Sequence, residues 1–200
     1  MNFDHLVVHP LTLDRWEDFE HLFGPRGASG GCWCMWFRLP RSQFDRLKGE
    51  GNQLGMKAIV ESGEVPGLLA YLPDPAQGDS LIPVGWCSVA PRGNFPVLAN
   101  SRILKPVDEL PVWSIVCFFI HRKYRRQGLT VQLLKAAVEY ARSHGAPAVE
   151  GYPVDPKSGA SPDAFMYHGL STAFRKAGFV EVARRSETRP IMRYLLETTA

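Results

Sequence analysis

The chain has 200 residues, of which 45% are hydrophobic and 22% are charged, and its formal net charge is +3. This composition is typical of one globular domain, predicted here to span residues 1–200, and it excludes a disordered chain and a collagen-like repeat. The small net charge does not by itself indicate a nucleic-acid-binding protein.

The sequence also lacks the features of secreted and membrane proteins. No stretch approaches the roughly 20 apolar residues of a membrane span, and the N-terminus lacks the charged-then-apolar pattern of a signal peptide. Cys87 and Cys117 lie inside apolar runs, and Cys32 and Cys34 form a C-x-C pair, which favours free thiols over a disulfide framework. We therefore expect a cytoplasmic protein with no membrane partner.

The first third of the chain predicts a strand, a helix and an aromatic segment. Residues 6–11 are typical of a strand, and the spacing of apolar residues in 14–23 predicts a helix that ends at the following Gly-Pro pair. Residues 30–38 have the sequence GGCWCMWFR, which is too aromatic for a linker, and residues 52–62 predict a second helix.

The middle of the chain predicts the centre of a sheet. Residues 68–72 and 84–89 are interpreted as antiparallel neighbours because a turn rich in Pro, Asp and Gly joins them. Residues 92–110 are expected to be irregular, with at most one short helix. Residues 112–120 form an apolar run of β-branched and aromatic residues, which predicts a strand buried on both faces.

The last third predicts alternating helices and strands, and so a mixed α/β protein. Residues 129–142 predict a helix that ends at Gly-Ala-Pro, and residues 149–154 a strand parallel to residues 112–120. The other predicted elements are a helix over 164–176 and strands over 180–184 and 191–196.

A basic glycine turn over residues 125–130 carries the clearest chemistry. It has the sequence RRQGLT and lies between the predicted central strand and the start of the long helix. A helix start presents unpaired N–H groups and the positive end of the helix dipole, and glycine lets phosphate oxygens approach the backbone. The turn lacks the glycine spacings of a P-loop and a Rossmann fold, so ATP and NAD are not expected. A pyrophosphate of another ligand would fit it.

These residues resemble the R/Q-x-x-G-x-G/A motif of the GNAT superfamily of acyl-CoA N-acyltransferases. Arg125 stands at the first position and Gly128 at the fourth, and Thr130 replaces the final Gly or Ala. Residues 120–124 are similar to the family's strand exit, with arginine in place of proline, and residues 176–179 match its K-x-G-F element. The resemblance implies a GNAT-like α/β fold, with a mixed, mostly antiparallel, twisted sheet of six or seven strands flanked by helices.

The resemblance also implies acetyl-CoA as co-substrate. In the family, the turn holds the pyrophosphate and the preceding strand pairs with the pantetheine arm. A fixed N–H group then stabilises the oxyanion that forms when an amine attacks the thioester. We expect direct acetyl transfer to a primary amine of a small molecule or a protein. The implied CoA-binding residues are Phe118, Phe119, Ile120, Arg125, Arg126, Gln127, Gly128, Leu129 and Thr130.

The catalytic acid departs from the family pattern, because Phe174 stands where many members carry a tyrosine. Tyr167 lies two turns earlier on the same predicted helix and is our candidate for the acid. His121 follows the central strand and is the candidate base, directly or through water, because histidine titrates near neutral pH. A packing role for Tyr167 and a place beside phosphate for His121 stay open. The other polar candidates on the helix are His168, Ser171 and Thr172.

The cysteines and the aromatic segment have alternative interpretations. Cys117 is expected to be a buried, inert thiol rather than an acyl-accepting nucleophile. Cys32 and Cys34 with His21 do not complete a zinc set, so no metal site is predicted. Residues 30–38 form either a wall of the acceptor site, with two tryptophans, a phenylalanine and one arginine charge, or a packed ledge beneath a loop.

Two alternatives to an enzyme remain open. A CoA-binding module without catalysis would explain the missing tyrosine, and it would bind CoA without turnover. A regulator that binds nucleic acid through the basic cluster of residues 121–126 would show salt-sensitive binding. The sequence has no recognised docking motif, so we expect no nucleic-acid partner. Exposed edge strands near the C-terminus could pair two copies into a homodimer.

Overall fold

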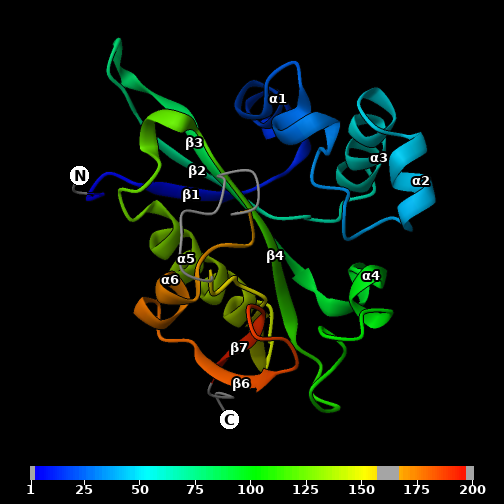
Figure 1. The fold of residues 1–200 in the computed structure, drawn as a ribbon. Coiled ribbons are helices and arrows are strands. Elements are labelled where there is room, and N and C mark those ends of the chain that lie inside the picture. The colour runs from blue at the N-terminus through cyan, green and yellow to red at the C-terminus, as the bar shows by residue number, and fades with distance from the viewer. Residues whose placement is uncertain (1–2, 157–166, 197–200) are drawn as a thin grey trace.

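Seven strands pair in the order β1-β2-β3-β4-β5-β7-β6, in a computed structural model that describes residues 3–156 and 167–196 (Figure 1). Neighbouring strands are antiparallel except β4 and β5, which are parallel. This mixed, mostly antiparallel sheet confirms the predicted fold class. The strands are β1 (Val7–Pro10), β2 (Leu68–Asp74), β3 (Gln77–Pro91), β4 (Trp113–Ile120), β5 (Ala148–Gly151), β6 (Val180–Arg184) and β7 (Pro190–Leu195).

Helices flank the sheet, with α1, α2 and α3 on one side and α5 and α6 on the other (Figure 1). A short α4 lies in the segment before β4, which agrees with the irregular stretch predicted there. In the described ranges, no helix has the length and apolar character needed to cross a membrane. The helices are α1 (Trp16–Phe23), α2 (Arg41–Arg46), α3 (Glu50–Glu61), α4 (Pro96–Ala99), α5 (Leu129–Ser143) and α6 (Ser171–Lys176).

β4 occupies the middle of the sheet, as its apolar run predicts. Ile115 and Phe118 belong to the hydrophobic core that includes α5, whereas Cys117 and Phe119 pack against the core on the α1 side. β4 pairs antiparallel with β3 and parallel with β5. The predicted parallel pair around the long helix is thus confirmed.

A β-bulge divides β4 into two halves. Ser88 of β3 pairs with Cys117, and the next residue, Val89, pairs with Ile115, so Val116 is the extra residue of the bulge. β5 pairs only with the first half of β4, as far as Ile115. The second half of β4 therefore has an edge that no described strand covers on the β5 side.

α5 begins and ends at glycines in the left-handed conformation. Gly128 is its N-cap with a φ of 95°, and Gly145 follows its last turn with a φ of 72°. Leu133, Ala137 and Ala141 are buried on one stripe of the helix, which packs against β3 and β4. This packing fixes the start of α5 beside the end of β4.

Aromatic side chains form the core on the opposite face of the sheet. Trp86 of β3 is fully buried, and its ring lies edge-on to Phe19, with 4.9 Å between centroids. Phe23 stacks on Trp33 at 5.7 Å and meets Phe119 of β4 at 5.2 Å. These contacts hold the aromatic segment of residues 30–38 over the second half of β4.

The C-terminal helix is shorter than predicted, and this changes the position of Tyr167. α6 begins at Ser171 rather than at residue 164, and residues 164–166 lie outside the described residues. Gly169 has a φ of 76° and Leu170 is extended, so these two residues separate α6 from the short 3-10 turn of Tyr167 and His168. The prediction that Tyr167 shares a helix face with Phe174 is therefore wrong.

Other boundaries differ by a few residues. β3 is longer than the predicted strand over 84–89, and β5 is shorter than the strand predicted over 149–154. α2 was not predicted, because six residues are too few to show a helical repeat. β6 is an edge strand with mostly exposed residues, and the pairing of two copies along it stays a prediction.

Candidate active site

The second half of β4 directs backbone groups toward its uncovered edge. The N–H of His121 donates to the carbonyl of Val84 on β3 at 3.0 Å. Because the backbone N–H and C=O groups of successive residues point to alternate sides of a strand, those of Phe119 also face β3. Those of Phe118 and Ile120 face the opposite way. Phe118 and Ile120 thus present their backbone to the edge, whereas Phe119 can contribute only its side chain.

A phenylalanine fills the space beside the end of β5. A Cβ at Gly151 would lie 2.1 Å from Cε1 of Phe174, so only glycine accommodates this ring. Phe174 is fully buried, and its ring lies 6.1 Å from that of Phe118 between centroids. The position where a tyrosine acid is usual in the family therefore holds a packing residue.

His168 binds the carbonyl of the bulge residue. Its Nδ1 donates to the carbonyl oxygen of Val116 at 3.2 Å, from a side chain that is 6% exposed. Burial, together with the charge of Arg189, lowers the pKa of His168 to about 3. The ring is thus neutral at physiological pH and acts as a hydrogen-bond donor that supports β4.

The basic turn lies at the predicted place, between β4 and α5. Nε2 of Gln127 donates to the carbonyl of Lys123 at 2.7 Å. Nε of Arg125 donates to the carbonyl of Ile120 at 3.0 Å. These bonds hold the turn against the end of β4, so that the turn and the uncovered strand edge are continuous.

The start of α5 is open to an anion. Gly128 has no side chain that could bond the first N–H groups of the helix, and a Cβ there would meet only Cε2 of Phe3, at 3.9 Å. Leu129 and Thr130 contribute N–H groups of the first turn, and Arg126 is exposed beside them, in a left-handed conformation. Such a helix start with nearby arginines is suited to a phosphate group.

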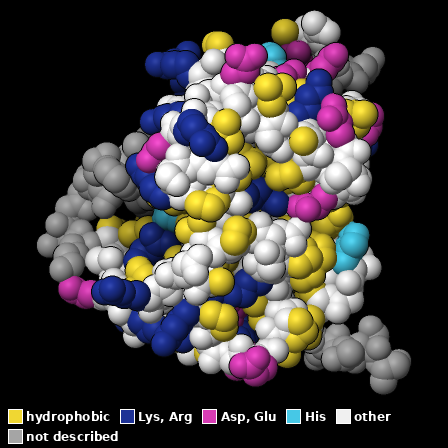
Figure 2. Space-filling model, turned by 90° about the vertical axis from the view of Figure 1, so that its right-hand side faces the viewer, with side chains coloured by type: hydrophobic (Ala, Val, Ile, Leu, Met, Phe, Trp, Pro, Cys, Tyr) yellow, Lys and Arg dark blue, Asp and Glu magenta, His cyan; other side chains and the backbone are white. Residues whose placement is uncertain are grey.

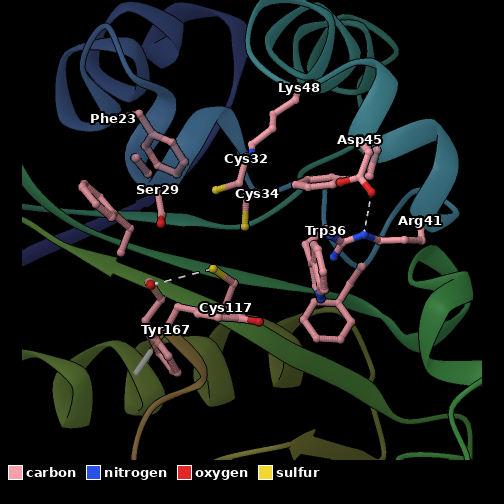
Figure 3. Close-up of a pocket in the computed structure, with 15 residues that line it drawn as sticks. Phe23, Ser29, Cys32, Cys34, Trp36, Arg41, Asp45, Lys48, Cys117 and Tyr167 are labelled. Atoms are coloured by element: carbon pink, nitrogen blue, oxygen red, sulfur yellow. Dashed lines mark hydrogen bonds and ion pairs between the residues drawn. The ribbon is translucent and has the colours of Figure 1, made fainter. Parts of the chain in front are cut away.

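A cavity of about 230 Å³ lies on the opposite face of β4 from α5. Figure 3 shows it between β4 below and the helical layer of α2 and the aromatic segment above. Cys117, Phe118 and Phe119 form its floor, and Tyr167 borders it. Because Phe118 belongs both to this floor and to the uncovered edge, the cavity meets the edge at the middle of β4.

Residues 30–38 provide both a wall of the cavity and part of the core. Cys32, Cys34 and Trp36 line the cavity, whereas Trp33 is buried between them. The backbone is left-handed at Trp33 and Cys34, with φ of 42° and 60°. Both interpretations of this segment, wall and ledge, therefore apply to different residues of it.

Glycines allow the loop before this segment to fold tightly. A Cβ at Gly27 would lie 2.3 Å from Nε1 of Trp33, and one at Gly31 would lie 2.6 Å from the backbone nitrogen of Gly49. Both glycines have positive φ. The loop thus brings its chain close to Trp33 and to the start of α3, which fixes the upper wall of the cavity.

Arg38 does not supply the charge predicted for this wall. It is 8% exposed, pairs with Glu64 at 2.8 Å, and lies over the ring of Phe95 at 4.8 Å. Burial of the aliphatic stem and pairing with a carboxylate direct it away from the cavity. The charged residues that line the cavity are Arg41, Asp45 and Lys48.

No sequence pattern indicated that these three residues would line a cavity. Arg41 and Asp45 lie on α2, and Lys48 follows that helix. Charged residues on a short polar segment are ordinarily solvated, and only the tertiary fold brings α2 over β4. The i, i+4 spacing of Arg41 and Asp45 was the one visible hint of a helix here.

Three cysteines border the cavity, and all four cysteines of the chain are free thiols. A hydrogen bond from the thiol of Cys117 lowers the pKa of Cys34, and the indole N–H of Trp86, 3.2 Å from its Sγ, adds to this effect. The contact with Cys34 and burial raise the pKa of Cys117. Cys117 was expected to be a buried, inert thiol. It is half-buried on the cavity floor rather than fully buried, and its raised pKa agrees with a thiol that stays protonated.

Metal binding finds no support in the geometry of the described residues. Within them, no three His, Cys, Asp or Glu side chains are grouped so that they could hold a metal ion.

Tyr167 reaches the cavity by a route that the sequence did not show. It precedes α6 in a short 3-10 turn, and its ring lies 4.0 Å from that of His168 between centroids. Burial raises the pKa of Tyr167, with a further contribution from Cys117. Its hydroxyl therefore stays protonated at neutral pH, as a proton donor must.

His121 lies beside the basic turn rather than in the cavity lining. Its Nδ1 is buried without a hydrogen-bond partner among the described residues. Burial, followed by the charge of Lys123, lowers the pKa of His121. The ring is therefore neutral near pH 7 and able to accept a proton.

The remaining polar candidates do not line the cavity. Ser171 is buried and donates to the carboxylate of Asp155, and Thr172 is exposed on α6. Neither side chain is placed to transfer a proton at the floor of the cavity.

The fold and the site together define the acyltransferase class. A family model described as Acetyltransferase (GNAT) family matches residues 34–154, more than half of the chain, and the chain belongs to this family. No curated protein sequence matches the chain.

Solved structures share the fold at low sequence identity. A GNAT-family acetyltransferase from Listeria monocytogenes 4b F2365 has a TM-score of 0.56 and 9% identity, covering 96% of this chain and 95% of that one. The ribosomal-protein-S5-alanine acetyltransferase from Vibrio fischeri has a TM-score of 0.51 and 10% identity, and the match covers 98% of this chain and 95% of that one. A chain of the NatC complex bound to Gag peptide and CoA has a TM-score of 0.53 and 11% identity, and the match covers 96% of this chain and 99% of that one. At these identities the likeness concerns the fold alone.

Proposed function

We propose that this protein transfers an acetyl group from acetyl-CoA to a primary amine that enters through the cavity over β4. The observation that carries the proposal is the meeting of three features at β4. These are an uncovered strand edge, a helix start without a side-chain cap, and an apolar cavity that reaches the same residues from the opposite face. Membership of the GNAT family supports acetyl transfer in general.

The residues at the turn fit the diphosphate of CoA. N–H groups between Arg126 and Thr130 would hold its oxygens, and Arg125 and Arg126 would add positive charge. The space over Gly128, which a side chain would fill, leaves room for these oxygens. Backbone groups of Phe118 and Ile120 would pair with the extended arm of the ligand, as an added strand would. The NatC structure, solved with CoA on the same fold, supports this choice of ligand.

The residues around the cavity would serve the chemical step. Bound acetyl-CoA supplies an activated thioester. The N–H of Phe118, which faces the edge, would stabilise the oxyanion that forms there. Tyr167 would protonate the departing thiolate, and neutral His121 would accept the amine proton through water. Direct transfer then needs no covalent intermediate on the protein.

The cofactor part of the proposal is tested by calorimetric titration of acetyl-CoA into wild type, Gly128→Ala and Gly145→Ala. Both glycines have positive φ, and an added Cβ would clash with nothing, because it would meet only Cε2 of Phe3 at 3.9 Å at Gly128 and no atom within 4 Å at Gly145. The two variants therefore carry a similar backbone strain at opposite ends of α5. We expect Gly128→Ala to weaken binding by about tenfold or more, because its methyl group occupies the phosphate approach. Equal affinities for both variants would contradict the proposed site.

A CoA-binding module without catalysis is the second candidate, and the buried Phe174 in the place of the usual tyrosine favours it. Release of CoA in the presence of amines distinguishes the two, since a module would bind acetyl-CoA without turnover. No specific observation on the described residues favours the nucleic-acid alternative. Figure 2 shows the face that carries α2 to α4, where basic, acidic and hydrophobic side chains are interspersed, so the described residues of this one face offer no continuous basic patch.

A further inference from the structure

The interior of the cavity is lined mainly by aromatic side chains and thiols. Phe23, Phe44, Phe119 and Trp36 present rings to it, and three cysteines border it. The hydroxyls of Tyr167 and Ser29 also line it. An apolar enclosure of this kind disfavours an ammonium group, and so it favours the neutral, nucleophilic form of an amine. It also favours an acceptor whose body is apolar.

The mouth of the cavity, by contrast, is charged. Arg41, Asp45 and Lys48 line it and are exposed, as Figure 3 shows for α2 and the residues after it. The two cations and one carboxylate leave one positive charge in excess. Asp45 is the one acidic residue among the described residues that line the cavity. A second cationic group on an acceptor would therefore meet more repulsion than attraction here.

Arg41 is arranged to receive an anion. Its Nε donates to Oδ2 of Asp45 at 2.7 Å, and its guanidinium lies over the ring of Trp36 at 4.3 Å. The carboxylate bonds Nε, so the Nη groups are left to donate to another acceptor. The stacked ring restricts the motion of the guanidinium, which makes its orientation toward the cavity more definite.

We propose that the acceptor is a monoamine with an aromatic body and an anionic group at the end far from the amine. The amine would lie on the β4 floor near Tyr167, the ring among the aromatic side chains, and the anion between Arg41 and Lys48. The small volume of about 230 Å³ fits a single-ring acceptor better than a polymer. This assignment rests on the proposed function and goes beyond it by excluding polyamines and other polycations.

The test compares three benzylamines that share one body and differ at the para position. They are 4-(aminomethyl)benzoate, benzylamine and 1,4-bis(aminomethyl)benzene. Their binding is measured by calorimetry on protein saturated with CoA, and their acetylation by CoA release from acetyl-CoA. At low salt we expect the carboxylate to bind about fivefold tighter than benzylamine and at least about tenfold tighter than the dication. The differences should shrink as salt is raised.

Charge reversal at the mouth provides a matched pair of variants. Lys48→Glu leaves the mouth with an excess negative charge and should invert the order, so that the dication binds tightest. Lys135 is exposed on α5, on the opposite face of the sheet, and Lys135→Glu makes the same change of net charge. This variant should preserve the wild-type order of affinities. A second probe, 6-aminohexanoate, has the same two end groups without a ring and should bind about tenfold more weakly than 4-(aminomethyl)benzoate.

The outcomes separate this inference from the proposed function. Tightest binding of the dication or of spermidine by wild type would overturn the inference, as would an unchanged order in Lys48→Glu. If 6-aminohexanoate binds as tightly as 4-(aminomethyl)benzoate, the inference that the acceptor has an aromatic body is wrong. If the predicted order of affinities holds but no CoA is released with any amine, the inference stands and the acetyltransferase proposal fails. If the amines are acetylated but their affinities fall in the opposite order, the acetyltransferase proposal stands and the inference fails.

Discussion

At the residue scale, Phe174 packs at the position where many family members carry a tyrosine, and Tyr167 lies at the cavity. Phe174 is sealed between Gly151 and Phe118, where it packs two strands and a helix together. Tyr167 lies half-buried at the cavity, with a pKa that burial raises. A proton donor at this floor would therefore come from outside the C-terminal helix.

This assignment predicts the behaviour of Tyr167→Phe. The variant should lower kcat for amine acetylation by about 10²-fold or more, with little change in the KM for acetyl-CoA, because it removes the acid and keeps the ring. Tyr140→Phe is the control, since Tyr140 is half-buried on α5, on the face of the sheet opposite the cavity. Steady-state kinetics of both variants check this. An unchanged kcat in Tyr167→Phe would contradict the role of Tyr167 as the acid and leave His121 as the remaining candidate for proton transfer.

At the scale of elements, the bulge in β4 decides the geometry of the site. Val116 shifts the register, β5 departs after Ile115, and the freed carbonyl of Val116 is taken by His168. The uncovered half of β4 thus has a protein partner at one end and open backbone groups farther along. The segment before α6 is fastened to β4 through this one buried imidazole.

This contact predicts a pH dependence of stability. The pKa of His168 is about 3 in the folded protein and near 6.5 when the side chain is unrestrained, so the unfolded chain binds more protons between these values. The neutral ring supports stability fully above about pH 6.5, and this support is lost as pH falls. From the linkage relation, the loss is about 2 kcal/mol at pH 5.

The measurement is urea unfolding of wild type and His168→Asn at pH 7 and pH 5. Asparagine keeps an N–H donor for the carbonyl of Val116 but does not titrate. We expect the variant to lose less stability than wild type between the two pH values. An equal loss in both proteins would show that other groups, and not His168, govern the acid limb.

At the scale of the whole molecule, a buried ionic cluster ties distant segments together. Arg193 of β7 bonds Oε1 of Glu150 on β5 at 2.6 Å and also pairs with Asp108, in the loop before β4, at 2.7 Å. Arg92 lies 3.7 Å from Oε2 of Glu150. Glu150 is 1% exposed, so these arginines and the hydroxyl of Tyr152, 3.4 Å from its Oε2, replace water around the carboxylate. One carboxylate thus links β5, β7 and the segments on either side of α4.

Removal of that carboxylate should be costly. Glu150→Ala leaves buried Arg193 and part-buried Arg92 without their shared partner, and breaking such a pair typically costs about 3–5 kcal/mol of unfolding free energy. Glu139→Ala breaks an exposed pair with Arg142 on α5 and should cost less than about 0.5 kcal/mol. Chemical unfolding of both variants checks this, and similar losses would contradict the structural weight given to Glu150.

Local sequence alone determined much of the fold. The apolar run of 112–120 and the amphipathic pattern of 129–142 predicted β4 and α5, and the glycine between them predicted the turn, because burial and backbone conformation depend there on neighbouring residues. The family resemblance added the sheet type, which the seven strands confirm. The single-domain organisation over residues 1–200 stays a prediction.

Tertiary structure decided the cavity and its chemistry. Arg38 looked free in the sequence and is paired with Glu64, whereas Arg41 and Lys48 looked like solvated charges and line the mouth. Tyr167 reaches β4 because Gly169 breaks the helix that its spacing suggested. Strand, turn and helix follow from local patterns, but the side chains that face one cavity come from segments far apart in the chain. Their meeting depends on how the helical layer packs on the sheet, which no local pattern encodes.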